Sequence, residues 1–359
     1  MTIWVEVRPS ALAANARAVQ SLLPPGGKLC AVVKANGYGH GAVAAARAFL
    51  AADAAMLAVT TVNEALELRA AGLRAEILLL GSHAPDECDT VVTDHLTATI
   101  SDEAAAERLA QAARQRGRPA PVHLLLDTGM GRDGLLPAAL GATWPRLVAN
   151  EWLRVAGVYT HFPNSIARDK EPTRRQLARF VELVGQLDPR PPIVHAANSG
   201  ATLDVPESRL DMVRVGTLLY GQYPSTHVGR LLDLQETWGL RARLVEVRRL
   251  PAGWTIGYGS ECRLWRSRLV GTLLVGWQHG FTLQPSSLTR GVRGLRALVC
   301  GETPSVTVRG VRCPVLGRIG MQSCCVDVTE VPGVQVGDVA SIPCRRVTTD
   351  RGIPRVALD

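Results

Sequence analysis

Short apolar runs alternate with amphipathic stretches through the first two thirds of the chain, and this alternation constrains the fold more than any other feature. The stretches between the runs, which include residues 62–72, 102–116 and 171–186, carry apolar residues at helical spacing with Arg and Glu opposite. The apolar runs centre on residues 29–34, 55–61, 76–81, 96–101, 121–127, 154–160, 193–197 and 212–215. Eight strands that alternate with helices over roughly 200 residues predict a (β/α)8 barrel of the TIM type.

The pattern changes after residue 235. Beyond that point strand-like runs are separated by Gly and Pro turns, and no long helical pattern occurs. The runs are residues 242–250, 269–275, 295–300 and 305–308. We therefore predict an α/β chain in which a barrel over residues 10–235 is followed by a mostly β C-terminal domain over residues 236–359.

Composition and cysteine spacing argue against several classes of protein. Eight cysteines are scattered along the 359 residues without a Cys-x-x-Cys pair, which favours reduced thiols over disulfides or a metal site. The chain has no signal-peptide pattern and no run of about 18 apolar residues, so we expect no membrane span and a cytoplasmic location. The net charge of +8 comes from arginines spread along the chain, without the dense basic block typical of nucleic-acid binding.

Lys34 is unusual because lysine is rare here. The 40 Lys and Arg residues include three lysines, Lys28, Lys34 and Lys170, which leaves 40 − 3 = 37 arginines. Lysine, unlike arginine, can lose its proton and form a Schiff base with a carbonyl group. Lys34 ends the apolar run 29–33 and precedes a glycine-rich turn, the place of a catalytic group at the C-terminal end of a barrel strand. On position alone, a lysine that closes a strand and reaches into water is the better interpretation, but the following residues reverse it.

The segment Lys34-Ala35-Asn36-Gly37-Tyr38-Gly39-His40-Gly41 resembles the pyridoxal-phosphate attachment motif of the alanine racemase family. The resemblance extends in family order along almost the whole chain. The other matching blocks are Leu126–Arg132, Thr160–Phe162, His195–Ser199, Arg214–Gly221, Ile256–Gly259 and Gly317–Met321. The resemblance implies that pyridoxal 5'-phosphate is the cofactor and that residues 1–9 join the β domain rather than the barrel.

The resemblance also implies roles for the matching residues. Lys34 would bind the cofactor, which supplies an electron sink, and act as one base, while Tyr258 would act as the second base on the opposite face of the substrate. The family places this tyrosine across a subunit interface, so we expect a homodimer with shared active sites and a small amino-acid substrate. The other residues with implied cofactor contacts are Tyr38, His161, Asn198, Ser199, Arg214, Gly216 and Thr217. Those implied in substrate binding are Arg132, Met321 and Trp277.

Arg214 has the most specific of the implied cofactor roles. It would donate a hydrogen bond to the pyridine nitrogen, and because arginine does not readily give up a proton, that nitrogen would stay unprotonated. His161 would link Arg214 to Tyr258 and help to lower the tyrosine pKa from its usual value of about 10.

Four departures from the family pattern lie mostly at the substrate end. Leu125 stands where the family has a lysine, commonly carbamylated, that orients the substrate-binding arginine. Trp277 and His279 stand in place of an entrance tyrosine and an aspartate, and Gln322 replaces an aspartate near the catalytic tyrosine. The region 338–354 is short and has no counterpart of a family tyrosine that completes the phosphate site. Because the cofactor anchor and both bases remain, we expect α-proton chemistry on a substrate shifted away from alanine.

Two other readings of the resemblance stay open. The chain could be a decarboxylase or another pyridoxal-phosphate enzyme on the same scaffold, although Tyr258 favours racemisation. It could also be a carrier or a catalytically degenerate pyridoxal-phosphate-binding protein. Carriers of that kind lack a β domain, whereas residues 236–359 predict one, and degeneracy fits poorly with the presence of Lys34, Arg214 and Tyr258.

Overall fold

The computed structural model describes residues 1–282 and 303–359, so the predicted strand over residues 295–300 lies outside the described residues. The chain divides into two compact units. Residues 9–237 form one, which we call the barrel unit. Residues 1–8 and 238–359 form the other, which we call the β unit.

Eight parallel strands make up the barrel unit's sheet, in the order β4-β3-β2-β9-β8-β7-β6-β5. The ring closes between β4 and β5, because the Leu79 N–H donates to the Thr97 carbonyl and the Thr97 N–H donates to the Ile77 carbonyl, both at 2.9 Å. The strands are β2 (Lys28–Val32), β3 (Met56–Val59), β4 (Ile77–Leu79), β5 (Ala98–Ile100), β6 (Ala120–Leu125), β7 (Leu153–Tyr159), β8 (Val194–His195) and β9 (Met212–Val215). Each predicted apolar run supplies one strand, and the predicted barrel is confirmed.

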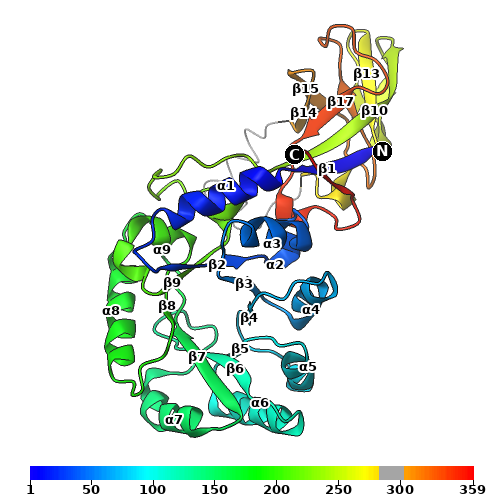
Figure 1. The fold of residues 1–359 in the computed structure, drawn as a ribbon. Coiled ribbons are helices and arrows are strands. Elements are labelled where there is room, and N and C mark those ends of the chain that lie inside the picture. The colour runs from blue at the N-terminus through cyan, green and yellow to red at the C-terminus, as the bar shows by residue number, and fades with distance from the viewer. Residues whose placement is uncertain (283–302) are drawn as a thin grey trace. The chain divides into compact units, whose positions relative to one another are not determined.

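Helices surround the strands of the barrel unit (Figure 1). The helices are α1 (Pro9–Gln20), α2 (Lys34–Tyr38), α3 (Ala42–Leu50), α4 (Val62–Ala70), α5 (Cys88–Thr93), α6 (Glu103–Gln115), α7 (Pro137–Ala149), α8 (Glu171–Gly185) and α9 (Ser199–Asp204). Local signals fix their starts: Asp102 caps α6 by accepting the Ala105 N–H at 2.7 Å, and Thr61 with Glu64 forms a capping box at α4. Within the described residues no helix has the length and apolar character that crossing a membrane requires.

The two halves of the barrel interior differ in polarity. An apolar cluster fills the part bounded by β2, β3, β4 and β9, and it consists of Cys30, Val32, Met56, Ala58, Leu78 and Met212. Strands β5 to β9 instead bring together polar side chains that are almost fully buried, namely Thr99, His123, Tyr159, His195 and Arg214. Buried polar groups are costly unless they are hydrogen-bonded, so the polar half of the barrel marks a site of specific interactions.

The β unit is built on one eight-stranded sheet in the order β13-β16-β15-β14-β17-β10-β1-β18. The strands are β1 (Ile3–Val7), β10 (Trp238–Leu250), β13 (Arg268–Leu273), β14 (Ser305–Val308), β15 (Val311–Leu316), β16 (Cys324–Asp327), β17 (Val339–Ile342) and β18 (Arg355–Ala357). Strand β10 is long and bulges between Leu244 and Glu246, which lets it pair with β1 and β17 along its first half and with β13 along its second. A short hairpin of β11 (Thr255–Ile256) and β12 (Cys262–Arg263) projects from this unit's chain.

Candidate active site

Lys34 lies at the end of β2 and begins a left-handed turn. Ala35, Asn36, Gly37 and Tyr38 all have positive φ, between 51° and 58°. Non-glycine residues rarely adopt this conformation, and such strain is held in place when the surroundings fix it. Here the Ala35 N–H donates to Glu64 Oε1 at 2.6 Å, and Asn36 Oδ1 accepts the Ala42 N–H at 3.1 Å. The turn therefore sets the Lys34 side chain at a defined position over the strand ends.

The Lys34 amine lies in a partly buried and electropositive place. Burial lowers its pKa from the usual value, the nearby Arg132 lowers it further, and Glu64 opposes these effects. A lowered pKa enlarges the fraction of neutral amine near neutral pH, and the neutral amine is the form that acts as nucleophile and base.

A corner with several hydrogen-bond donors lies where β2 and β9 run side by side. Tyr38 stacks on Tyr220 with ring centroids 4.6 Å apart, and its ring reaches the backbone of Gly216. A Cβ at Gly216 would collide with the Tyr38 hydroxyl oxygen and lie 2.8 Å from Tyr38 Cζ, so this position requires glycine. The Gly216 N–H donates to Ser199 Oγ at 3.3 Å, and the Tyr38 hydroxyl has no hydrogen-bond partner within the described residues.

Two other expected cofactor residues flank this corner. Thr217 begins a short 3-10 helix (Thr217–Tyr220) directly after Gly216. Asn198 caps α9, and its side chain is occupied within the protein: Nδ2 donates to the Phe162 carbonyl at 3.0 Å, and Oδ1 accepts from Ser165 Oγ at 2.6 Å. Asn198 thus holds Ser199 and the loop after β7 in place. The donors at Tyr38, Ser199 and Gly216 can bind an oxyanion such as a phosphate.

Arg214 is a buried cation with neutral partners. Its side chain, 3% exposed, donates from Nη1 to His195 Nδ1 at 2.8 Å and from Nη2 to the carbonyls of Thr160 and Ala196 at 2.6 and 3.2 Å. Its guanidinium also lies 4.7 Å from the centre of the Tyr159 ring. No Asp or Glu of the described residues forms an ion pair with it. Burial lowers the pKa of Arg214, yet a guanidinium remains charged at any ordinary pH.

His161 follows β7 and lies beside Arg214, whose Nη2 donates to His161 Nδ1 at 3.3 Å. Because Nδ1 accepts this bond, the neutral ring carries its proton on Nε2. Burial and then the charges of Arg214, Arg132 and Lys34 lower the pKa of His161 to about 3. His161 is therefore a neutral imidazole at neutral pH.

Arg132 ends a loop that Asp127 organises. The Asp127 carboxylate accepts the N–H groups of Gly129, Met130 and Gly131 at 2.8 to 2.9 Å, which explains the Asp-x-Gly-Met-Gly pattern. Burial acts to raise the pKa of Asp127, but these N–H groups lower it below its usual value. The Arg132 side chain is exposed, and within the described residues it forms no hydrogen bond or ion pair.

Leu125 lies behind this loop and is 4% exposed. Its side chain packs so closely on the loop that a Cβ at Gly134 would lie 2.9 Å from Leu125 Cγ. The position therefore holds an apolar side chain packed into the protein, and it supplies no anionic partner to Arg132.

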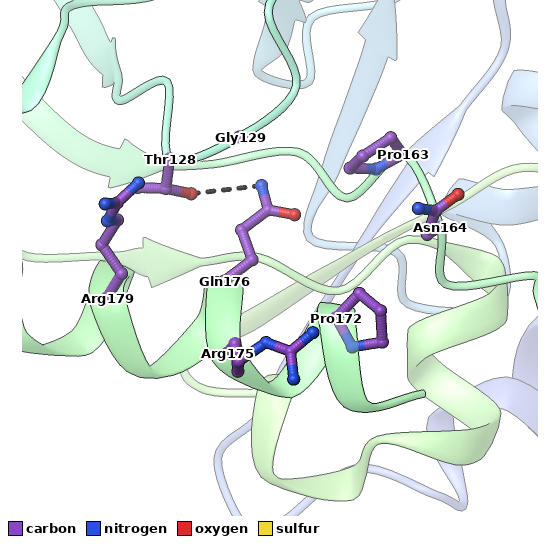
Figure 2. A pocket seen from close by; sticks show the side chains of 8 residues that line it. All are labelled: Thr128, Gly129, Pro163, Asn164, Pro172, Arg175, Gln176 and Arg179. Atoms are coloured by element: carbon purple, nitrogen blue, oxygen red, sulfur yellow. Dashed lines mark hydrogen bonds between the residues drawn. The ribbon is translucent and has the colours of Figure 1, made fainter. Parts of the chain in front are cut away.

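The same loop lines part of a cavity of about 360 Å³. Thr128 and Gly129 line it together with Arg175 and Arg179 of α8 (Figure 2). Gln176 forms its floor and donates from Nε2 to Thr128 Oγ1 at 3.1 Å and to the His161 carbonyl at 3.0 Å. None of the expected site residues lines this cavity, but Gln176 ties its wall to the backbone of His161.

The β unit carries the remaining expected residues. Tyr258 lies in the turn of the β11–β12 hairpin and is 82% exposed. Trp277 and Met321 are 46% and 55% exposed, and their segments touch: the Trp277 N–H donates to the Gly320 carbonyl at 3.2 Å. Gln322 Nε2 donates to Gln278 Oε1 at 3.1 Å, so the amide that replaces a family aspartate pairs with a second neutral amide. The Met321 N–H has no hydrogen-bond acceptor among the described residues.

Sequence reasoning missed several residues of this site. His195 and His123 complete the surroundings of Arg214, and Glu64 holds the turn after Lys34. His195 did stand in a block that matches the family, and its place at a strand end was the available signal. Nothing comparable marked His123 or Glu64, because their contacts join strands and helices far apart in the chain.

A parallel barrel followed by a β unit, with a lysine at the end of a barrel strand, is the architecture expected from the resemblance. Residues 7–224 match the family model of the alanine racemase N-terminal domain, and residues 237–353 match that of the alanine racemase C-terminal domain. The chain belongs to the alanine racemase family.

Known members of the family are similar over nearly their whole length. The chain is 37% identical to an alanine racemase of Desulfovibrio desulfuricans, over 94% of this chain and 87% of that protein. It is 38% identical to one of Desulforamulus reducens, over 97% and 93% respectively. The alanine racemase structure from Clostridium difficile 630 superposes with a TM-score of 0.92 at 27% identity, covering 100% of this chain and 96% of that one. The structure from D-cycloserine-producing Streptomyces lavendulae gives 0.86 at 30% identity, covering 100% and 97%.

Proposed function

We propose that this protein is a pyridoxal-phosphate-dependent amino-acid racemase that interconverts L and D enantiomers by two-base proton transfer. The observation that carries the proposal is that a lysine with a lowered pKa, an oxyanion-binding corner and a buried arginine lie together at the ends of β2 and β9. These strands are paired neighbours, with Cys30 opposite Arg214 and Ala31 opposite Val215. Membership of the alanine racemase family supports the same activity.

The residues present fit pyridoxal phosphate. Tyr38, Ser199 and the Gly216 N–H would hold the phosphate, and Arg214 would donate to the pyridine nitrogen. The collision that any Cβ at Gly216 would cause supports a cradle kept open for a ligand. So does the Tyr38 hydroxyl, which has no partner among the described residues. When bound, the cofactor supplies an electron sink that stabilises negative charge at the substrate α-carbon.

Two proton carriers would serve the two faces of the α-carbon. The lowered pKa of Lys34 favours a neutral amine that can take the α-proton from the D enantiomer. Tyr258 would take it from the L enantiomer. Arg132 and the Met321 N–H, both without protein partners in the described part of the chain, would bind the substrate carboxylate.

Enantiomers in deuterated water give the first test. Either pure enantiomer of a substrate should racemise and gain deuterium at the α-carbon. A deuterated amine would instead reveal a decarboxylase, and the absence of exchange in a protein that still binds the cofactor would reveal a degenerate binding protein. Borohydride reduction followed by peptide mapping should place the cofactor adduct on Lys34. An adduct at Lys28 or Lys170 would contradict the assignment.

The chirality of the substrate distinguishes the roles of the two bases. Tyr258→Phe should abolish α-exchange of the L enantiomer and leave measurable exchange of the D enantiomer, because Lys34 remains. Trp265→Phe is a matched control, since Trp265 is also a highly exposed aromatic residue of the β unit, 88% exposed, with no proposed role. If Tyr258→Phe lost α-exchange equally for the L and D enantiomers while it still bound the cofactor, a single base would be indicated.

We further propose that the protein is a homodimer in which each active site takes Tyr258 from the partner. The high exposure of this tyrosine in the β unit is consistent with such a role. Lys34→Ala and Tyr258→Phe proteins, each inactive towards the L enantiomer, should regain activity when their subunits exchange, because one site of the heterodimer then has both bases. Verified exchange without any return of activity would refute the shared site.

The proposed substrate range extends beyond alanine to larger or more acidic amino acids. Arg132 has no counter-charge among the described residues, and Gln322 presents an amide instead of a carboxylate near the catalytic tyrosine. Both features favour a substrate that carries additional negative charge. Alanine should remain a slow substrate, because a pocket seldom excludes a smaller side chain strongly. A screen of amino acids for α-proton exchange tests this range, and alanine as the best substrate would contradict it.

We also propose a cytoplasmic location. The cysteines in the described part of the chain are all free thiols, which suits a reducing compartment. Fractionation of the native host with antibody detection would check it.

A further inference from the structure

Three buried side chains form a hydrogen-bonded row through the polar half of the barrel. Arg214 Nη1 lies 2.8 Å from His195 Nδ1, and His195 Nε2 lies 2.8 Å from His123 Nδ1. The two imidazole rings are 0% exposed, and Arg214 is 3% exposed. The row starts on β9, crosses β8 and ends on β6, so it runs across strands rather than along one.

The Arg214 guanidinium determines which ring nitrogen of His195 and of His123 carries the proton. Arginine has five N–H donors and no acceptor, so His195 Nδ1 must accept. A neutral His195 then carries its proton on Nε2 and donates it to His123, whose Nδ1 must accept in turn. His123 consequently carries its proton on Nε2. In each hydrogen bond of the row the donor lies on the Arg214 side. No other neutral tautomer of either histidine satisfies both the Arg214–His195 and the His195–His123 contact.

His123 is held at the end of this row by its neighbours. Strands β6 and β7 shift register after Val122, and the shift sets His123 opposite Gly157. A Cβ at Gly157 would lie 2.7 Å from His123 Cε1, so the glycine is what admits the ring. The Nε2 atom of His123 has no hydrogen-bond partner in the described structure, which is an uncommon cost for a buried donor. A leucine would avoid that cost, so the imidazole must serve the row through its other nitrogen.

Tyr159 completes the support of Arg214 from a second direction. Its ring stacks on His195 with centroids 4.9 Å apart at 22°, and the Arg214 guanidinium lies over it. The Tyr159 hydroxyl is fixed in turn by Thr99 Oγ1 at 2.8 Å. Arg214 Nη2 is bound by the Thr160 and Ala196 carbonyls, while its Nη1 is bound by His195 Nδ1. The readiness of that nitrogen to accept depends on His123.

We propose that His123 is a positioning residue that locks the tautomer of His195 and, through it, the orientation of Arg214. Its importance for the reaction rests on the proposed function, in which Arg214 contacts the cofactor ring. Without an acceptor at position 123, His195 either keeps an unpaired buried N–H or moves its proton to Nδ1, where it faces the Arg214 donor. Both outcomes loosen the guanidinium.

Two substitutions separate the acceptor from the bulk of the ring. His123→Leu removes the acceptor, whereas His123→Asn retains one, because Asn Oδ1 occupies about the position of His Nδ1. Leu124→Ala on the same strand is the control, because it removes buried packing without touching the row. The measurement is the imidazole ¹⁵N spectrum of the full-length protein, with and without pyridoxal phosphate, with signals assigned by single substitutions of the eight histidines.

In the native protein, with or without the cofactor, His123 and His195 should each show a protonated Nε2 and a bare Nδ1. The His195 pattern should persist in His123→Asn and in Leu124→Ala and be lost or split in His123→Leu. His123→Leu should lower kcat about tenfold for both enantiomers and change KM little. A tenfold loss is the effect of one lost buried hydrogen bond. His123→Asn should restore most of that loss.

A proton on Nδ1 of either histidine in the native protein would overturn the proposal. So would a His195 pattern that His123→Leu leaves unchanged, or equal kcat values for the Leu and Asn variants. The spectra need no turnover, so a native protein without racemase activity would refute the proposed function while the row is still tested.

Discussion

Acidification should destabilise the cofactor-free protein at an unusually high pH, because the buried His123 and His195 and the half-buried His161 stay neutral in the folded state. Burial, followed by the charge of Arg214, lowers the pKa of His123 to about 3 and that of His195 well below the usual value of 6.5. The same two causes, in that order, lower the pKa of His161 to about 3. In the unfolded chain all three titrate at about 6.5.

The sign follows from proton counting. Between pH 6.5 and 3 the unfolded state binds protons that the folded state does not, so the free energy of unfolding falls as the pH falls. It is constant above the unfolded pKa. Each fully buried group contributes at most about 1.4 kcal/mol per pH unit, and the three together contribute about 4 kcal/mol per unit. From pH 6.5 to 5 the loss is about 5 kcal/mol, comparable to the whole stability of many domains.

Urea unfolding at pH 7.5, 6.5, 6.0, 5.5 and 5.0 measures this slope while most Asp and Glu side chains remain ionised. His123→Asn removes one of the three groups and should reduce the slope by about one third. Leu124→Ala should lower the free energy of unfolding by a similar amount at every pH and leave the slope unchanged. A flat profile down to pH 5, or an equal slope in His123→Asn, would refute the assignment of these histidines as neutral buried groups.

Three substitutions at the site have expected outcomes. Gly216→Ala should weaken pyridoxal-phosphate binding at least about tenfold in an absorbance titration, because the new Cβ collides with the Tyr38 hydroxyl. Gly141→Ala, whose Cβ meets open space, should leave the affinity unchanged. Asp127→Ala should free the N–H groups of Gly129 and Met130 and loosen the loop that carries Arg132. It should therefore raise KM for the substrate more than it lowers kcat. Leu125→Lys should raise the ratio of kcat/KM for alanine to that for the best substrate, where a tenfold rise corresponds to about 1.4 kcal/mol.

Each of these outcomes has a clear contrary result. Unchanged cofactor affinity in Gly216→Ala would mean that Tyr38 does not meet the ligand there. A fall in kcat at constant KM in Asp127→Ala would give its loop a role in the transition state rather than in substrate binding. An unmoved substrate ratio in Leu125→Lys would make Leu125 a neutral replacement.

The barrel followed from the sequence because its signal is local and repeated. Each strand is a short run of buried apolar residues, and each helix shows its own amphipathic spacing and caps, so no long-range contact was needed to find them. The polar half of the interior gave no such signal. His123 occupies one position of an otherwise apolar strand, and only the register of β6 against β7 and β8 brings it to His195.

The site residues divide in the same way. Lys34 and Gly216 could be named as candidates from the sequence because a strand-end lysine and an ordered set of blocks carry the resemblance. Asn198 is predicted at the cofactor, and its side chain also bonds to Phe162 and Ser165 and supports the loop after β7. A block match cannot distinguish a residue that touches a ligand from one that holds such a residue.

Arg214 and Arg132 of the barrel site are held in opposite ways. This contrast indicates which part of the site can adapt to a new substrate. Arg214 is buried and its direction is fixed by His195, by two carbonyls and by the Tyr159 ring. Arg132 is exposed and has no partner in the described structure. A group whose geometry is set by several neighbours tolerates little change, whereas one without partners can adapt to a new ligand. Substitutions around Arg214 should therefore reduce turnover of every amino acid to the same extent, while substitutions around Arg132 should alter the ranking of substrates. A substitution at His195 that changed the ranking would contradict this division.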